Sequence, residues 1–130
     1  SAAARIDFRL RPFEDSDIRY AIISDLHANL EATTAVLARI DQLGIDQLLC
    51  LGDFVGYHAE PNQVVDLIRG RPLRAIAGNH DRTAVSTTVP DYFAADARRA
   101  IQWTRSVLSE STKEFLARLP TSLPVGVATH

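Results

Sequence analysis

The sequence has few of the features that mark several large classes of protein. It contains a single cysteine, Cys50, so no disulfide framework can form within the chain. Cys50 lies inside an apolar run, where it is predicted to pack as a small core residue and not to act as a nucleophile. The formal net charge is -2, so composition provides no basic surface that would hold nucleic acid. We therefore do not expect nucleic acid as a surface-binding partner.

Long apolar segments are also missing. The uninterrupted apolar runs are far shorter than the roughly 20 residues that a membrane-spanning helix needs. The sequence opens with a serine and three alanines, without the apolar core of a secretory leader. We therefore expect no membrane partner and a cytoplasmic location. With 130 residues, 46% of them hydrophobic and 23% charged, the chain has the composition of one globular domain.

What the sequence does have is an alternation of short apolar runs and amphipathic segments. The predicted strands and helices cover, in turn, 20–23, 29–43, 47–51, 61–69 and 73–77. Asn29 is a suitable N-cap for the first helix, and Pro61 fits the first turn of the second. Strands and helices in this order predict right-handed crossovers and a parallel sheet. Ligands of such sheets bind beyond the carboxyl ends of the strands.

The last third of the chain returns to helical periodicity. The apolar spacing over 93–108 predicts one helix. A shorter helix follows, beginning at Ser109 or Ser111, and Ser111 and Glu114 have the spacing of a capping box. A final strand is predicted over 123–129. No internal repeat or low-complexity segment is evident.

Polar residues that can bind cations follow each predicted strand. They are Asp25 and His27 after the first strand, Asp53 after the second, Asn79, His80 and Asp81 after the third, and His130 at the end. Gly52 directly precedes Asp53, and Gly78 directly precedes Asn79. Carboxylate, imidazole and amide oxygen together suit Mn, Fe, Zn or a related divalent ion. The absence of usable thiolates argues against a structural zinc site of the cysteine type. The two glycines suit tight turns that bring backbone close to a ligand.

Each motif alone has a simpler interpretation. Asp-x-His and Gly-Asp can be ordinary polar residues at strand ends, and Asn79 can assist a turn with left-handed backbone. A receiver-like domain that binds Mg²⁺ would use Asp25 and Asp53, but it would leave His27, Asn79 and His80 without a role. Since all the motifs follow predicted strands in order and share one sheet edge, their conjunction favours a metal site.

Three stretches of the chain resemble the first signature motifs of the calcineurin-like metallophosphoesterases. They are Ser-Asp-Leu-His-Ala-Asn at 24–29, Leu-Gly-Asp-Phe-Val-Gly-Tyr at 51–57 and Ala-Gly-Asn-His-Asp at 77–81. The chain is most similar to the small bacterial and archaeal phosphodiesterase-like branch. The resemblance implies an α/β (α+β) fold, the N-terminal part of a four-layer αββα sandwich with a mostly parallel sheet flanked by helices. Residues 19–130 would be a partial domain, and residues 1–18 an N-terminal extension. Within that extension, the mixture of charged and isolated apolar residues over 5–18 permits a short edge strand and then a turn at Pro12.

The resemblance also implies a role for each polar residue. The metal ligands would be Asp25, His27, Asp53, Asn79 and His130, with Asp53 bridging two divalent ions (Mn, Fe, Zn or Ni). His80 would protonate the leaving oxygen or stabilise charge on the phosphoryl group, and Asp81 would orient the His80 imidazole. The implied reaction is hydrolysis of a small phosphomonoester or phosphodiester by a water molecule that the two metals activate.

Three departures from the family pattern qualify this expectation. Ala28 and His58 stand where members of this branch often have glycine. The chain also ends before the later Gly-His-x-His motif, so we expect weak metal binding and impaired turnover. An inactive fragment or a metal- or phosphate-binding module is the alternative. The chain holds the first sheet of the expected sandwich, so an apolar face of this sheet would be left uncovered. We expect either a second copy of the chain, in a homo-oligomer, or further residues to cover that face.

Overall fold

The computed structural model of the chain describes residues 3–7 and 18–125. Its elements, in order, are β1 (Ala3–Asp7), β2 (Arg19–Ile23), α1 (Leu30–Gln42), β3 (Gln47–Cys50), α2 (Pro61–Arg69), β4 (Leu73–Ala75), α3 (Asn79–Ala84), α4 (Ala95–Val107) and α5 (Glu110–Arg118). The three predicted strands and the four predicted helices of this range are confirmed, with ends that differ by one or two residues. The short helix α3 was not predicted.

The four strands form one sheet in the order β1-β2-β3-β4. The pairs β2–β3 and β3–β4 are parallel, and β1 runs antiparallel to β2 at the edge. The prediction of a mostly parallel sheet is therefore confirmed, and the N-terminal edge strand is present at Ala3–Asp7. The turn predicted at Pro12 lies outside the described residues.

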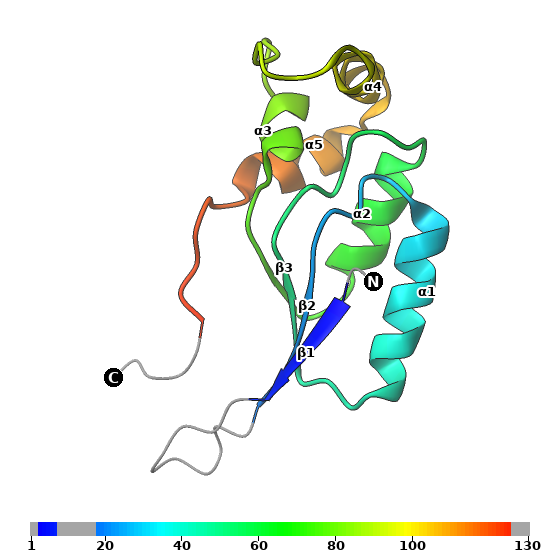
Figure 1. Cartoon of the computed structure of the whole chain (residues 1–130), viewed down its shortest axis with the longest axis vertical. Coiled ribbons are helices and arrows are strands. Elements are labelled where there is room, and N and C mark those ends of the chain that lie inside the picture. The colour runs from blue at the N-terminus through cyan, green and yellow to red at the C-terminus, as the bar shows by residue number, and fades with distance from the viewer. Residues whose placement is uncertain (1–2, 8–17, 126–130) are drawn as a thin grey trace.

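Helices α1 and α2 cover the same face of the sheet (Figure 1). This follows from topology, because the strand order advances in one direction and each crossover is right-handed. The register places Ala21 beside Leu48, and Leu48 beside Leu73, on this face. These side chains pack with Leu37 and Ile40 of α1 in the main hydrophobic core. Burial of this face holds the ends of the parallel strands in place.

The opposite face carries the alternate residues of the strands, because side chains point to the two faces in turn. Tyr20 and Leu49, on this face, are both buried, and Ile22 is partly buried. The Arg74 guanidinium donates a hydrogen bond to the Pro124 carbonyl at 2.6 Å. The described chain therefore covers part of this face, and the homo-oligomer that would complete the cover stays a prediction.

Two details of the C-terminal third differ from prediction. Ser109, and not Ser111, caps α5: its hydroxyl accepts a hydrogen bond from the Thr112 N–H at 3.2 Å. Ser111 lies inside the helix, and its hydroxyl accepts a hydrogen bond from Arg69, so the capping box of Ser111 and Glu114 is wrong. The strand predicted over 123–129 is absent at 123–125, and the remainder lies outside the described residues.

Two expectations from composition can also be compared with the structure. Cys50 is buried in the core, and burial raises the pKa of its thiol to about 12, as suits a packing residue. Within residues 3–7 and 18–125, no helix combines the length and the apolar character that crossing a bilayer requires.

Candidate metal centre

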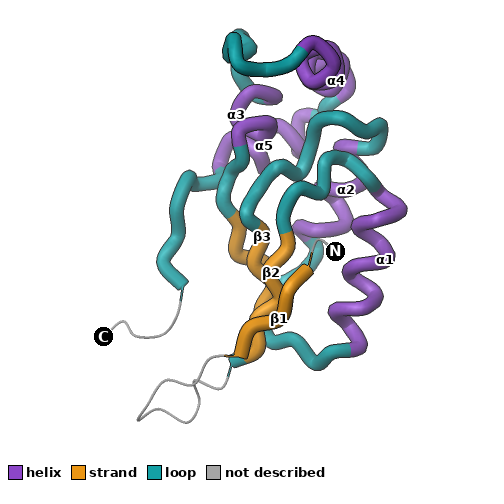
Figure 2. Tube along the Cα trace, viewed as in Figure 1, coloured by secondary structure: helices purple, strands orange, loops and turns teal. Residues whose placement is uncertain are grey.

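The loops that follow β2, β3 and β4 gather at one end of the sheet (Figure 2). Hydrogen bonds of the parallel sheet continue into two of these loops: the Asp25 N–H donates to the Gly52 carbonyl and the His27 N–H to the Asp53 carbonyl, both at 2.9 Å. The Ala28 N–H donates to the Phe54 carbonyl at 2.8 Å. The first and second motifs therefore run side by side, and their side chains lie together because their backbones are paired.

Several residues of these loops have left-handed backbone, which is costly for a side chain other than glycine. The φ angles are 60° at Asp25, 46° at His27, 60° at Ala28 and 59° at Asp53. Such strain persists only where the surrounding structure enforces it, and it concentrates at functional sites. The value at Ala28 is one that glycine adopts without this cost.

His27 points its Nε2 at two carboxylates. Its Nδ1 lies 2.9 Å from the Val55 carbonyl, which can only accept a hydrogen bond, so Nδ1 carries a proton. Its Nε2 lies 3.2 Å from Asp25 Oδ1 and 3.9 Å from Asp53 Oδ2. Nε2 and the two carboxylates can be bridged by a proton or by a cation. Val55 thus fixes His27 in the tautomer that binds metals.

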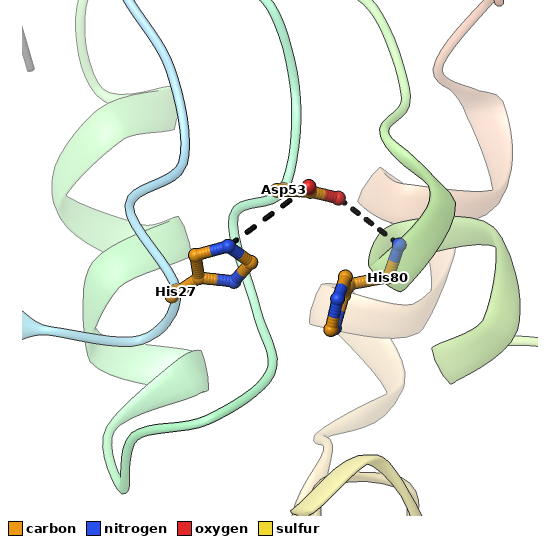
Figure 3. Close-up of side chains that lie close together, drawn as sticks. All are labelled: His27, Asp53 and His80. Carbon is orange, nitrogen blue, oxygen red and sulfur yellow. Dashed lines mark hydrogen bonds and ion pairs between the residues drawn. The ribbon is translucent and has the colours of Figure 1, made fainter. Parts of the chain in front are cut away.

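Asp53 joins the second motif to the third. Its Oδ1 accepts a hydrogen bond from the His80 backbone N–H at 3.0 Å, while Oδ2 faces His27 (Figure 3). The bond to His80 orients the carboxylate at the start of α3. One oxygen is therefore held by protein, and the other is available to a ligand.

The His80 ring is buried among aromatic rings, with 7% of the residue exposed. Its ring centroid lies 4.8 Å from that of His27, 5.0 Å from Tyr57 and 4.9 Å from Phe93. Burial, and to a lesser degree the nearby His27, lowers the pKa of His80 against the opposing effect of Asp53. The ring is therefore neutral at neutral pH. Its Nδ1 is buried without a hydrogen-bond partner among the described residues.

These groups fit a divalent cation. One ligand atom each from His27, Asp53 and His80 lies within 4.8 Å of the others. Two imidazoles and a carboxylate are ligands that Zn, Mn, Fe and Ni accept, and Asp25 adds a second carboxylate at the His27 nitrogen. The Asp25 side chain is 61% exposed, so it borders the open side of the cluster. Asp25, His27 and Asp53, expected as ligands, are thus brought together, and His80 joins them.

The hydrogen bonds that the structure shows for the Asp81 carboxylate come from backbone N–H groups, and its expected role of orienting the His80 ring stays a prediction. Its Oδ2 accepts hydrogen bonds from the N–H groups of Asp53 at 2.7 Å and Gly78 at 2.9 Å, and its Oδ1 accepts from Phe54 at 2.8 Å. Burial raises the pKa of Asp81 to about 6, although these bonds oppose the rise. Asp81 is fully buried and fastens the second motif to the third. Through the bond to the Asp53 N–H, Asp81 helps to position Asp53.

The other two expected ligands have different outcomes. Asn79 is the first residue of α3 and is partly buried, directly before the His80 N–H that binds Asp53. Its role as a ligand stays a prediction. His130 lies outside the described residues. The structure adds Val55 and Tyr57, which contact His27 and to which the sequence assigned no role. Their only signal was their place inside the second motif.

Gly78 allows α3 to approach the second motif closely. A Cβ atom at Gly78 would overlap the Asp53 carboxylate and backbone nitrogen. Replacement Gly78→Ala is therefore expected to lower the free energy of unfolding by about 1–3 kcal/mol and to displace Asp53. Gly70→Ala is the matched control, because its Cβ would meet only ordinary contacts at 3.8 and 3.9 Å. Chemical denaturation of both variants tests this, and equal stabilities would contradict it.

The chain is similar in sequence and fold to phosphoesterases of known structure. The family model described as the calcineurin-like phosphoesterase superfamily domain matches residues 18–124. An uncharacterized protein of Methanocaldococcus jannaschii is 45% identical over 100 residues, which are 77% of this chain and 41% of that protein. The crystal structure of a metallophosphoesterase from Sphaerobacter thermophilus matches with a TM-score of 0.69 and 38% identity, over 84% of this chain and 44% of that one.

A second solved structure supports the fold alone. A hypothetical protein from Pyrococcus horikoshii matches with a TM-score of 0.68 at 21% identity, covering 76% of this chain and 46% of that one. The chain therefore spans less than half the length of the relatives that it matches.

Proposed function

Because the chain belongs to the calcineurin-like phosphoesterase superfamily, we propose that it carries metal-binding residues of a hydrolase acting on small phosphomonoesters or phosphodiesters. The observation that carries the proposal is the convergence of His27 Nε2 with the carboxylates of Asp25 and Asp53. Nε2 is the nitrogen with which histidine commonly binds metals, and here it faces the oxygens of two carboxylates. The activity of the whole protein is part of this proposal, since the chain spans under half of its relatives.

In this proposal, Asp25, His27, Asp53 and Asn79 hold divalent ions, together with His130. When bound, such ions neutralise the charge of the phosphate and lower the pKa of a water molecule that attacks phosphorus. His27 is oriented by Val55, and Asp53 by the His80 backbone N–H. The neutral His80 ring carries one N–H, which can donate a hydrogen bond to the leaving oxygen.

Metal removal provides the test. Treating the purified protein with a chelator is expected to abolish hydrolysis of bis(p-nitrophenyl) phosphate, because the phosphate then faces the Asp25 and Asp53 carboxylates without a metal ion to offset their charge. Adding back Mn, Fe, Zn or Ni should restore release of p-nitrophenolate in proportion to bound metal, which elemental analysis measures.

Two results would contradict the proposal. Full activity in the presence of chelator would exclude a metal-dependent reaction. Stoichiometric binding of metal without turnover, with each of the four metals, would instead support a metal- or phosphate-binding module without catalysis.

A further inference from the structure

We propose that a cavity of 710 Å³ between the start of α1, the loop over 57–60 and α4 binds a small organic cation that carries an alkylated ammonium group. The cavity is lined by none of the residues that converge at the metal centre, Asp25, His27, Asp53 and His80. It is therefore a site of its own, and binding there does not require the phosphoesterase function proposed above. Its volume falls within the range of about 300–1,000 Å³ that is typical of small-molecule sites.

The cavity is lined by two carboxylates, those of Glu31 and Glu60, that have no hydrogen bond or ion pair with the described part of the chain. Glu60 is partly buried and stands at the N-cap of α2, yet its side chain makes no capping bond. A partly buried carboxylate loses solvation, and a cation compensates for that loss. The Arg99 guanidinium also lines the cavity, but it is paired with Asp96 at 2.6 Å. The charge of the lining therefore favours a cationic ligand.

Two aromatic side chains of the lining favour an organic cation over an inorganic one. Tyr57 and Trp103 are 52% and 45% exposed, so each offers ring surface to a ligand. Aromatic rings attract ammonium groups through their quadrupole, and quaternary ammonium ligands are the group that proteins most often recognise in this way. The alkyl groups of such a ligand would also bury apolar surface against Ala59 and Ala100. A hydrated inorganic ion has no such apolar surface to bury.

Choline and 3,3-dimethyl-1-butanol are matched probes, because they have the same shape and differ in the charge of the central atom. Isothermal titration, with a chelator present to keep metal ions out of the metal centre, is expected to show saturable binding of choline. The affinity for choline should exceed that for the neutral alcohol by about tenfold or more. Trp103 is the single tryptophan of the sequence, so a parallel change in its fluorescence places the ligand in this cavity.

Variants separate the charge from the rings. Glu60→Gln should weaken choline binding about fivefold to tenfold, because it removes a carboxylate and keeps the shape of the side chain. Glu110→Gln is the matched control: Glu110 is exposed at the start of α5 and does not line the cavity, so its replacement should leave choline affinity unchanged. Tyr57→Ala should weaken binding about tenfold, whereas Tyr57→Phe should retain it, since a ring is what the ammonium group requires.

Three results would overturn this cation site. They are the absence of saturable choline binding, equal affinity for choline and the neutral alcohol, and unchanged choline affinity in either Glu60→Gln or Tyr57→Ala. Because the Glu60 carboxylate has no partner in the described part of the chain, Glu60→Gln should fold normally, which circular dichroism checks. Choline affinity that both variants lower and Tyr57→Phe retains would support the site, whether or not the protein hydrolyses phosphate esters.

Discussion

Replacement Asp53→Asn is expected to lower divalent metal affinity by at least about a hundredfold and to abolish metal-dependent hydrolysis. Even residues that only orient a metal ligand contribute about 10–100-fold to affinity, so loss of a ligand charge should cost at least as much. The fold should survive, because an asparagine Oδ1 can still accept the His80 N–H bond now made by Asp53 Oδ1. Asparagine also tolerates the left-handed backbone at this position, where φ is 59°.

Isothermal titration with Mn, followed by the hydrolysis assay, measures the effect. Asp66→Asn is the matched control, because Asp66 is an exposed residue of α2 that pairs with Arg69. It removes the same charge far from the three loops and should leave metal affinity unchanged. Wild-type affinity in Asp53→Asn, with a normal circular dichroism spectrum, would exclude Asp53 as a ligand.

Replacement Asp81→Asn is expected to lower the free energy of unfolding by about 2–4 kcal/mol. In the structure, the backbone N–H groups of Asp53 and Gly78 both donate to Oδ2 of Asp81. The side-chain NH₂ group of asparagine in that position would face these two donors and could not accept their hydrogen bonds. Each buried N–H left without an acceptor costs about 1–3 kcal/mol. Removing a buried charge offsets part of this loss, since burial already raises the pKa of Asp81 to about 6.

Urea denaturation at neutral pH, where the Asp81 carboxylate is ionised, measures this loss. Asp96→Asn is its control: Asp96 is exposed at the start of α4, and an exposed i,i+3 ion pair contributes about 0.5 kcal/mol or less. If Asp81 merely oriented the His80 ring, Asp81→Asn would leave stability near that of the control. Such a result would reverse the assignment of Asp81 as the residue that fastens the two motifs.

The sequence alone was enough to predict the elements that depend on local pattern. Apolar runs marked β2, β3 and β4, and Asn29 and Pro61 opened α1 and α2 as predicted. These signals are reliable because periodicity decides which face of an element is buried, and burial supplies most of the stabilisation. Parallel order then placed the polar motifs at one edge of the sheet.

Other features had no local signal. The third motif was expected to be a loop, yet it opens α3 with Asn79, because Gly78 lets the chain approach Asp53 without a side chain between them. Ser109 and Ser111 were equally good caps by residue type, and only the path of the chain between α4 and α5 put Ser109 at the extended position that caps. The partners of Asp81 likewise come from another loop.

By itself, therefore, the sequence determined which residues form the sheet and which polar groups reach its carboxyl edge, since both depend on residue order and hydrophobic period. The tertiary structure alone decided which nitrogen of His27 faces the carboxylates, which backbone N–H groups donate to Asp81 and that the His80 ring joins the cluster. The physical reason is that a tautomer, a saturated carboxylate and a shared cation site depend on atoms from different loops. Only the folded backbone sets the distances between those atoms.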